Sequence, residues 1–390
     1  MHRSAKRRLI PIYAAILLLV FHTFLVAYIN SSFLEQFIDA KSVGTIYTVG
    51  SALSVLIFLF ISRVLQVVGN FKLTIGLLLT NFIAVLGMSQ ATILEVAIPL
   101  FIVHLITVPL IIFNLDVFME ERIGNDESGT GSSRGLLLTL ASLMGAVSPL
   151  ISGLLIGTTG TDFTNAYVVS ALTLIPVLGV LLVYFRTFSD PAYGEIDVFS
   201  AIHSFWINVN IRSVFIAHFL LQMFFMMMVV YTPLYLTSTI GLTWAEFGII
   251  MFFAQLAYVI FEYPIGIIAD RYIGEKEMMA AGFLIIVIAT AWMSFVTVAS
   301  VLVWSVIMFT TRVGAALVEV TTESYFFKQT KSSDAQIISF FRVTRPLAYV
   351  LGAVVASLSL LYVPFNLLFI VFAFLMIPAM FCTLYIEDTK

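Results

Sequence analysis

Charge is scarce in this sequence. Only 11% of the 390 residues are Asp, Glu, Lys or Arg, against roughly 25% in a typical soluble domain. The net charge is −3 and no basic tract is present, so nothing indicates a nucleic-acid partner. One cysteine, Cys382, excludes an intramolecular disulfide and any cysteine-based metal site. Because 61% of the residues are hydrophobic, polar side chains are too few to cover a water-soluble surface, and we expect the chain to lie in a lipid bilayer.

The motifs of common enzymes are also missing. The sequence has no P-loop, no metal-ligand cluster and no nucleophile elbow. We therefore expect no catalytic residue, no metal and no cofactor. The alternative among enzymes is a polytopic membrane enzyme, such as a lipid-modifying transferase, which would need an acid and histidine cluster at the membrane face. A channel is disfavoured, because no ring or filter motif is present.

Long apolar runs are what the sequence does contain. A helix needs about 20 apolar residues to span a bilayer. Twelve spans are predicted, near residues 9–32, 42–62, 72–91, 94–118, 135–157, 165–186, 211–238, 245–268, 277–298, 300–326, 336–361 and 364–386. The first is too long for a signal peptide and has no small-residue cleavage site at its end.

The basic residues predict an orientation. Among those in loops and at span ends, only Lys41 falls on the side opposite the N-terminus. Since lysine and arginine favour the cytoplasmic side, we expect both termini in the cytoplasm and a multi-pass protein of the cell (inner or plasma) membrane. We expect it to be a monomer surrounded by lipid.

The longest connection divides the spans into two groups of six. The predicted units are a six-helix bundle over 1–186, a cytoplasmic linker over 187–210 and a second six-helix bundle over 211–390. Apolar residues recur in the linker at helical spacing, which predicts an amphipathic helix on the inner membrane surface. They are Ile196, Phe199, Ile202, Trp206 and Val209. An irregular linker is the alternative.

The two halves carry similar acidic pairs. Asp116 precedes Glu120 by four residues near the end of the fourth span, and Glu319 precedes Glu323 in the same way near the end of the tenth. This spacing places both carboxylates on one helix face. A parallel repeat of six spans is therefore predicted.

A second likeness lies in the connections after spans two and eight. Aligning Gly69 with Gly274 sets Leu65 against Asp270. The same alignment sets Gln66 against an arginine. The charged pattern is thus present only in the second half.

That charged stretch, GIIADRYIGEK at 266–276, resembles the signature of the major facilitator superfamily. The signature reads roughly G-x-x-x-D-R/K-x-x-G followed by basic residues. Its positions are held here by Gly266, Asp270, Arg271, Gly274 and Lys276. With the six-plus-six layout, the resemblance covers the whole chain. It implies an all-α integral membrane fold in which two six-helix bundles rock about a central site, giving alternating access.

The resemblance also implies that the motif is a conformational latch. Asp270, Arg271, Glu323 and Arg342 would form an ionic network at the inner face, which breaks when the protein opens inward. Gly266 would let two helices meet closely.

The fifth span resembles the antiporter signature of the same superfamily, G-x8-G-x3-G-P-x2-G-G. Gly135, Pro149 and Gly153 match it, whereas Met144, Ser148 and Ser152 stand at other glycine positions. The resemblance implies export. A packing face of small residues is the alternative.

Charged residues inside the spans are candidates for function because charge is costly in hydrocarbon. Glu262 and Glu319 are candidate proton carriers. The alternative is permanent pairing with Arg312, Arg342 or Arg345.

The resemblance implies a midplane substrate site built from spans one, four, seven and ten. The candidate substrate-binding residues are His22, Tyr28, His104, His218, Gln222, Tyr231 and Arg312. Arg312 at mid-depth would favour an anionic substrate or would hold a proton-carrying acid. His22, alone in an apolar run, could equally be a hydrogen-bonding residue of helix packing.

Taken together, the residues and the resemblance predict a secondary active transporter of a small organic solute. We expect protons as the coupling ion, with sodium as the alternative, and slightly favour efflux. The alternative within the class is a proton-linked importer of a sugar, a nucleoside or another metabolite.

Overall fold

The computed structural model describes residues 2–123, 130–157, 160, 162–191, 193, 206–329 and 335–387. The description leaves out the side chains of 2–8, 120, 123, 130–136, 138, 270, 271, 327, 329 and 335–342. Within these residues every regular element is a helix. Most of the proposed amphipathic linker helix falls outside the described residues, so it stays a prediction.

The first half contains six long helices and one short one. They are α1 (His2–Ala27), α2 (Asn30–Glu35), α3 (Ala40–Val68), α4 (Asn70–Met88), α5 (Leu94–Ile123), α6 (Thr130–Ile156) and α7 (Thr164–Tyr184). α2 continues the course of α1, and Leu9–Glu35 together form one apolar stretch.

The second half repeats this order. Its helices are α9 (Val209–Leu234), the π-helical turn η2 (Tyr235–Thr239), α10 (Trp244–Arg271), α11 (Glu275–Met293), α12 (Val301–Gln329), α13 (Ala335–Ser359), the 3₁₀ turn η3 (Phe365–Leu367) and α14 (Leu368–Leu384). Local chemistry fixes their starts. Thr243 and Glu246 form a reciprocal capping box at α10, and the Asn208 side chain accepts from two backbone N–H groups at α9.

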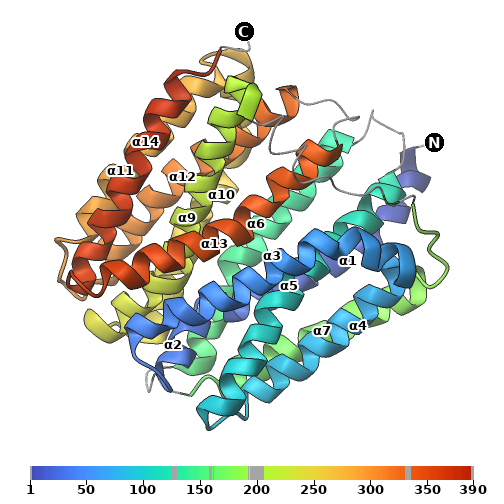
Figure 1. Ribbon diagram of the computed structural model, residues 1–390, viewed down its shortest axis with the longest axis horizontal. Coiled ribbons are helices and arrows are strands. Elements are labelled where there is room, and N and C mark those ends of the chain that lie inside the picture. The colour runs from blue at the N-terminus through green and yellow to red at the C-terminus, as the bar shows by residue number, and fades with distance from the viewer. Residues whose placement is uncertain are drawn as a thin grey trace.

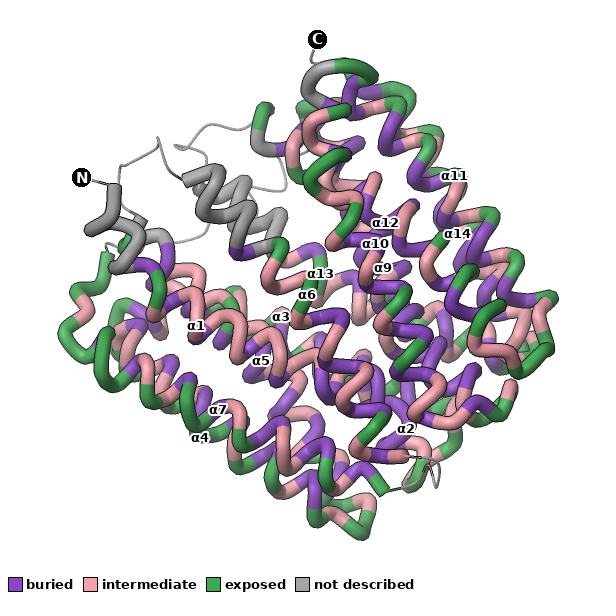
Figure 2. Tube along the Cα trace, turned by 180° about the vertical axis from the view of Figure 1, so that it is seen from behind, coloured by how far each residue is buried: buried purple, intermediate pink, exposed green. Residues whose placement is uncertain are grey.

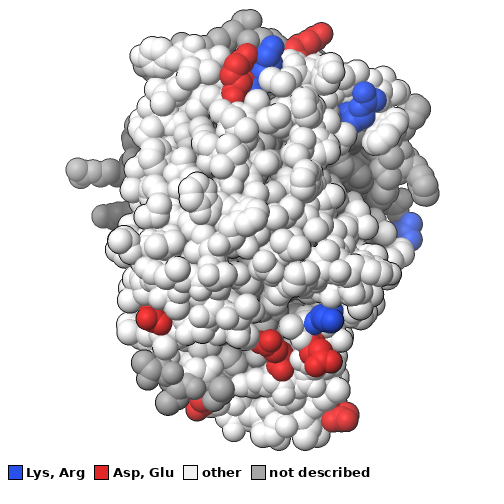
Figure 3. Space-filling view, turned by 90° about the vertical axis from the view of Figure 1, so that its left-hand side faces the viewer, with Lys and Arg blue, Asp and Glu red and all other residues white. Residues whose placement is uncertain are grey.

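These helices confirm the predicted spans. Among the described residues, eleven helical stretches are long and apolar enough to cross a membrane, and α13 adds the apolar stretch Val343–Ser359. On the face shown in Figure 3, charged side chains gather near the two ends and the broad band between them is almost free of charge. Such a band suits the hydrocarbon core of a bilayer.

The helices form two bundles that meet along a seam. α1 begins and α14 ends at the same end of the molecule (Figure 1), here called the terminal end; the other is the far end. The pairs α6–α10 and α3–α13 make the extensive contacts between the bundles. Buried residues concentrate in the helices along this seam (Figure 2), and 67% of the apolar window of α9 is buried. α9 is therefore a central packing helix rather than a lipid-facing one.

Glycine allows the close crossing of α6 and α10 near the far end. A Cβ on Gly153 would lie 2.4 Å from the Trp244 carbonyl oxygen, and one on Gly248 would lie 2.6 Å from the Pro149 carbonyl oxygen. Gly153 and Pro149 belong to the antiporter-like stretch of the fifth span. The structure thus gives this stretch a packing role in the seam, as its alternative interpretation predicted.

Candidate functional site

Arg312 of α12 lies at the centre of the molecule. Its side chain is only 2% exposed, and its Nη1 atom has no hydrogen-bond partner among the described residues. The guanidinium lies over the Phe224 ring of α9, with Cζ 5.7 Å from the ring centroid, which is a cation–π distance. A buried cation of this kind needs further partners.

Tyr28 brings the opposite bundle to Arg312. Its hydroxyl lies beside the guanidinium and accepts a hydrogen bond from Gln255 Nε2 at 3.0 Å. The Tyr28 ring also packs edge-on against Phe247, with centroids 5.9 Å apart. The structure therefore brings together two of the predicted site residues, one from the turn after α1 and one from α12. Gln255 of α10 was missed, although it is a lone amide in the apolar run 245–268.

Two carboxylates lie one layer nearer the terminal end. Glu262 of α10 accepts from Ser142 Oγ of α6 at 3.2 Å, a contact across the seam. Glu319 of α12 is influenced by the charges of Glu323 and Glu262, and by those of Arg345 and Arg312. Both acids are partly buried. Glu262 follows Gln255 by seven residues on α10, and Glu319 follows Arg312 by seven residues on α12. Each acid therefore lies about two turns, or 10 Å, further along its helix.

His22 and His104 are placed elsewhere. Within the first bundle, His22 Nδ1 lies 2.8 Å from the Ser170 carbonyl oxygen, and Asn81 joins both rings, at 3.0 Å from His22 Nε2 and 2.8 Å from His104 Nδ1. Thr107 adds a hydrogen bond to Asn81. This buried network ties α1, α4, α5 and α7 together, so it serves packing inside one bundle. The alternative stated for His22 agrees with this placement.

The three α9 candidates lie at different depths. His218 Nε2 and Gln222 Nε2 are 3.4 Å apart, one helical turn from each other. Tyr231 lies at the α3–α13 crossing, where a Cβ on Gly44 would be 2.2 Å from both the Tyr231 hydroxyl and Ser357 Oγ. The structure therefore places Tyr231 in the seam toward the far end.

Comparisons with known proteins agree with this fold. The family model described as Major Facilitator Superfamily matches residues 12–330 and, in a second match, 214–390. The chain belongs to the major facilitator superfamily. It is a membrane transporter built on that fold, and the recognition of the family from sequence is confirmed.

Solved structures of this superfamily fold are similar over nearly the whole chain. One is the nucleoside transporter NupG, with a TM-score of 0.73 and 13% identity, covering 96% of this chain and 98% of that one. Another is the POT family transporter PepTSo, with a TM-score of 0.75 and 10% identity, covering 97% of each chain. A third is a POT family transporter in complex with 5-aminolevulinic acid, with a TM-score of 0.76 and 13% identity, covering 97% of this chain and 95% of that one. A search of curated proteins finds no match.

The superfamily motif at 266–276 forms the junction between α10 and α11. Gly274 has a φ of 103°, a conformation that favours glycine, and α11 starts at the next residue. That residue, Glu275, is buried and forms an ion pair with Lys328 at the end of α12. Glu275 also accepts from Ser324 Oγ at 3.4 Å. This pair was not predicted.

Other motif residues are only partly defined. Lys276 Nζ lies 3.9 Å from the exposed Glu277 carboxylate. Glu323 is exposed and has an interaction of its own. A Cβ on Gly266 would meet Val320 at an ordinary 3.9 Å, so the close approach expected there is not found. The side chains of Asp270, Arg271 and Arg342 fall outside the description, and the latch stays a prediction.

The matching junction of the first half uses a different acid. Gly69 has a φ of 84° and precedes α4 directly. Asp190, from the segment after α7, accepts from the Asn70 backbone N–H at 2.7 Å and from the Tyr193 hydroxyl at 2.6 Å. Gln66 Nε2 donates to the Tyr193 carbonyl oxygen at 2.8 Å. A carboxylate from the predicted linker thus lies at the first-half junction, whose own motif has none.

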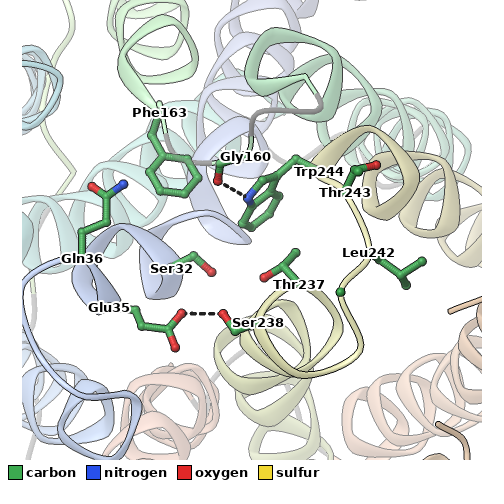
Figure 4. A pocket seen from close by; sticks show the side chains of 11 residues that line it. Ser32, Glu35, Gln36, Gly160, Phe163, Thr237, Ser238, Leu242, Thr243 and Trp244 are labelled. Carbon is green, nitrogen blue, oxygen red and sulfur yellow. Dashed lines mark hydrogen bonds between the residues drawn. The ribbon is translucent and has the colours of Figure 1, made fainter. Parts of the chain in front are cut away.

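At the far end, a pocket lies on the seam between the bundles (Figure 4). Two hydrogen bonds cross it: Trp244 Nε1 donates to the Gly160 carbonyl oxygen at 3.1 Å, and Ser238 Oγ donates to Glu35 at 2.8 Å. Phe163 packs edge-on against Trp244 with centroids 5.5 Å apart. These contacts join the two bundles on the far side of the Arg312 layer.

Proposed function

We propose that this transporter couples the movement of a small organic solute to protons, by alternating access. The observation that carries the proposal is the pair Glu262 and Glu319, two partly buried carboxylates at the seam beside the central Arg312 layer. Carboxylates inside a membrane protein are typical of proton relays.

The geometry suits a proton that moves with the conformational change. Glu262 is held across the seam by Ser142, at 3.2 Å, so rocking of the bundles would alter its surroundings. Two neighbouring carboxylates repel each other when both are ionised, and one bound proton removes that repulsion. The carboxylates would then bind the proton when the seam opens to one side of the membrane and release it when the seam opens to the other.

The finer points of the proposal follow the sequence. Both termini lie in the cytoplasm, because basic residues gather on that side. The membrane is the cell membrane and the working unit is a monomer. The antiporter-like pattern of the fifth span, whose glycine also serves packing, favours export over the alternative of import. The motif at 266–276 acts as a latch at the inner face, beside the observed Glu275–Lys328 pair.

The test is transport by purified protein in liposomes, with and without a pH gradient. The first solutes to try are uridine, dialanine and 5-aminolevulinic acid, because the similar structures are a nucleoside transporter and peptide-family transporters. We expect Glu319→Gln to abolish proton-driven accumulation while solute exchange continues, because exchange needs no net proton movement.

Glu95→Gln is the matched control, because Glu95 is an exposed carboxylate at the start of α5. It should leave both activities unchanged. Equal loss of accumulation and exchange in Glu319→Gln would contradict a proton role. Solute movement without proton movement in the wild type would remove proton coupling altogether.

A further inference from the structure

The charge of Arg312 is unbalanced in the layer where it lies. The side chain is 2% exposed, and one of its terminal nitrogens has no hydrogen-bond partner among the described residues. The charge of Glu319, seven residues further along α12, reaches it from the neighbouring layer. Its contacts are the neutral Tyr28 hydroxyl and the Phe224 ring. An ion buried without a counter-charge is costly, so a site of this kind is completed by an anion.

We propose that the central site binds solutes that carry a carboxylate, held by Arg312 of one bundle and Tyr28 of the other. The proposal rests on the transport function proposed above and names the substrate class. The guanidinium presents several N–H donors in a plane that matches a carboxylate. The Tyr28 oxygen already accepts from Gln255 Nε2, at 3.0 Å, so its own proton is available for an acceptor such as this.

The acids of the chain are not placed to occupy this position. Glu319 follows Arg312 by seven residues on α12, a separation of about 10 Å along the axis. Among cations, Arg345 influences Glu319 more strongly than Arg312 does. Glu262 is held instead by Ser142 of α6. Glu319 therefore acts on Arg312 only through its charge, and the Nη1 atom, which has no partner among the described residues, can take an anion from outside.

The side chains around the site indicate which chemical groups the solute carries besides its carboxylate. Phe224 and Phe247 border the Arg312–Tyr28 pair. We therefore expect a carboxylate attached to an apolar or aromatic body.

The test compares carboxylates with their neutral amides. Purified protein is titrated with benzoate and benzamide, with indole-3-acetate and its amide, and with succinate and succinamide. Binding is read as the rise in melting temperature and as quenching of tryptophan fluorescence. We expect at least one carboxylate to bind and its amide to bind at least tenfold more weakly. This comparison uses the wild-type protein, so it does not depend on whether a variant folds.

Variants then locate the binding. Arg312→Gln should weaken carboxylate binding at least tenfold, and Arg312→Lys should retain part of it. Tyr28→Phe should weaken it several-fold. Arg122→Gln is the matched control, because Arg122 also stacks on a phenylalanine, 4.7 Å from the Phe185 centroid, but is exposed at the end of α5. The Arg122→Gln variant should bind the carboxylate as strongly as the wild type does.

Several outcomes would overturn the carboxylate site. They are amides binding as well as carboxylates, no carboxylate binding at all, or Arg312→Gln binding like the wild type. If a neutral solute is transported and Arg312→Gln stays fully active, transport stands and the carboxylate site falls. If carboxylates bind through Arg312 but liposomes show no transport, the site stands and the proposed function falls.

Discussion

The α3–α4 junction and the α10–α11 junction have the same backbone and different polar contacts. Each is a single glycine in the left-handed region, Gly69 at φ 84° and Gly274 at φ 103°, followed directly by the next helix. In the second half the first residue of that helix is Glu275, which pairs with Lys328 of the same bundle. In the first half it is Asn70, whose backbone N–H is bound by Asp190, 120 residues further along the chain.

This difference shows that the same backbone conformation at the two junctions is stabilised by different polar contacts. The second-half pair joins α11 to α12, and both partners belong to one bundle. The first-half contact joins α4 to the segment that leads toward the second bundle. We infer that the linker is part of the structure of the first bundle, whereas the second-half junction is held by its own helices.

The largest effect should follow loss of the second-half ion pair. Lys328→Met removes this cation from Glu275, whose side chain is 1% exposed, so the buried carboxylate loses the ion pair that it makes with α12. We expect a loss of roughly 2 kcal/mol in the free energy of unfolding. Thermal unfolding in detergent, compared with the wild type, measures it.

Glu275→Gln should lower the free energy of unfolding by less, because the Lys328 side chain is 41% exposed and its charge can stay in water. Lys276→Met is the control, since Lys276 and Glu277 are 3.9 Å apart and both reach solvent. If Lys328→Met were no more harmful than Lys276→Met, the pair would not stabilise this junction.

A smaller effect is expected at the first-half junction. Asp190→Ala removes the acceptor for the Asn70 N–H at the start of α4, and loss of such a cap costs about 1 kcal/mol. It should also free the segment that follows α7. Trypsin cleavage after the exposed Arg186 should therefore become faster, which limited proteolysis with gel analysis would show.

Asp162→Ala is the matched control. Asp162 caps α7 locally, where its Oδ1 accepts from the Thr164 N–H at 2.9 Å. It should lower stability by a similar amount without changing cleavage after Arg186. Unchanged cleavage in Asp190→Ala would show that the linker is not held by this contact.

Much of the fold could be predicted because its signals are local. Hydrophobic length alone located the spans, and α3 and α10 differ from the prediction mainly by extending to Val68 and Arg271 at the terminal end. The alignment of Gly69 with Gly274 was also sound, since a positive φ demands the same residue in both halves.

The site was predictable only in part because it depends on helix rotation, which sequence does not give. A lone polar residue in an apolar run can face a cavity or a neighbouring helix. Tyr28 and Arg312 face the seam, whereas His22 and His104 face into their own bundle and bond to Asn81. Asp190 was missed because its partner lies far away in sequence, and it carries no motif of its own.

The smallest effect, and the sharpest test of the linker contact, concerns Tyr193. Its hydroxyl donates to Asp190 Oδ1 at 2.6 Å. Burial, and then the hydrogen bond to Asp190, raises the pKa of Tyr193, so the hydroxyl stays protonated in the folded protein. Its contribution to stability is therefore fully present below the unfolded pKa of about 10 and is lost as the pH rises further.

Tyr193→Phe should cost roughly 0.5–1 kcal/mol, the usual contribution of one hydrogen bond, and the cost should be the same at pH 6 and pH 9. Because the hydroxyl acts through Asp190, the double variant Asp190→Ala with Tyr193→Phe should be no less stable than Asp190→Ala alone. Thermal unfolding of the four proteins completes this cycle. Additive losses would mean that the two side chains stabilise the junction independently, and that the Tyr193 hydroxyl does not act through Asp190.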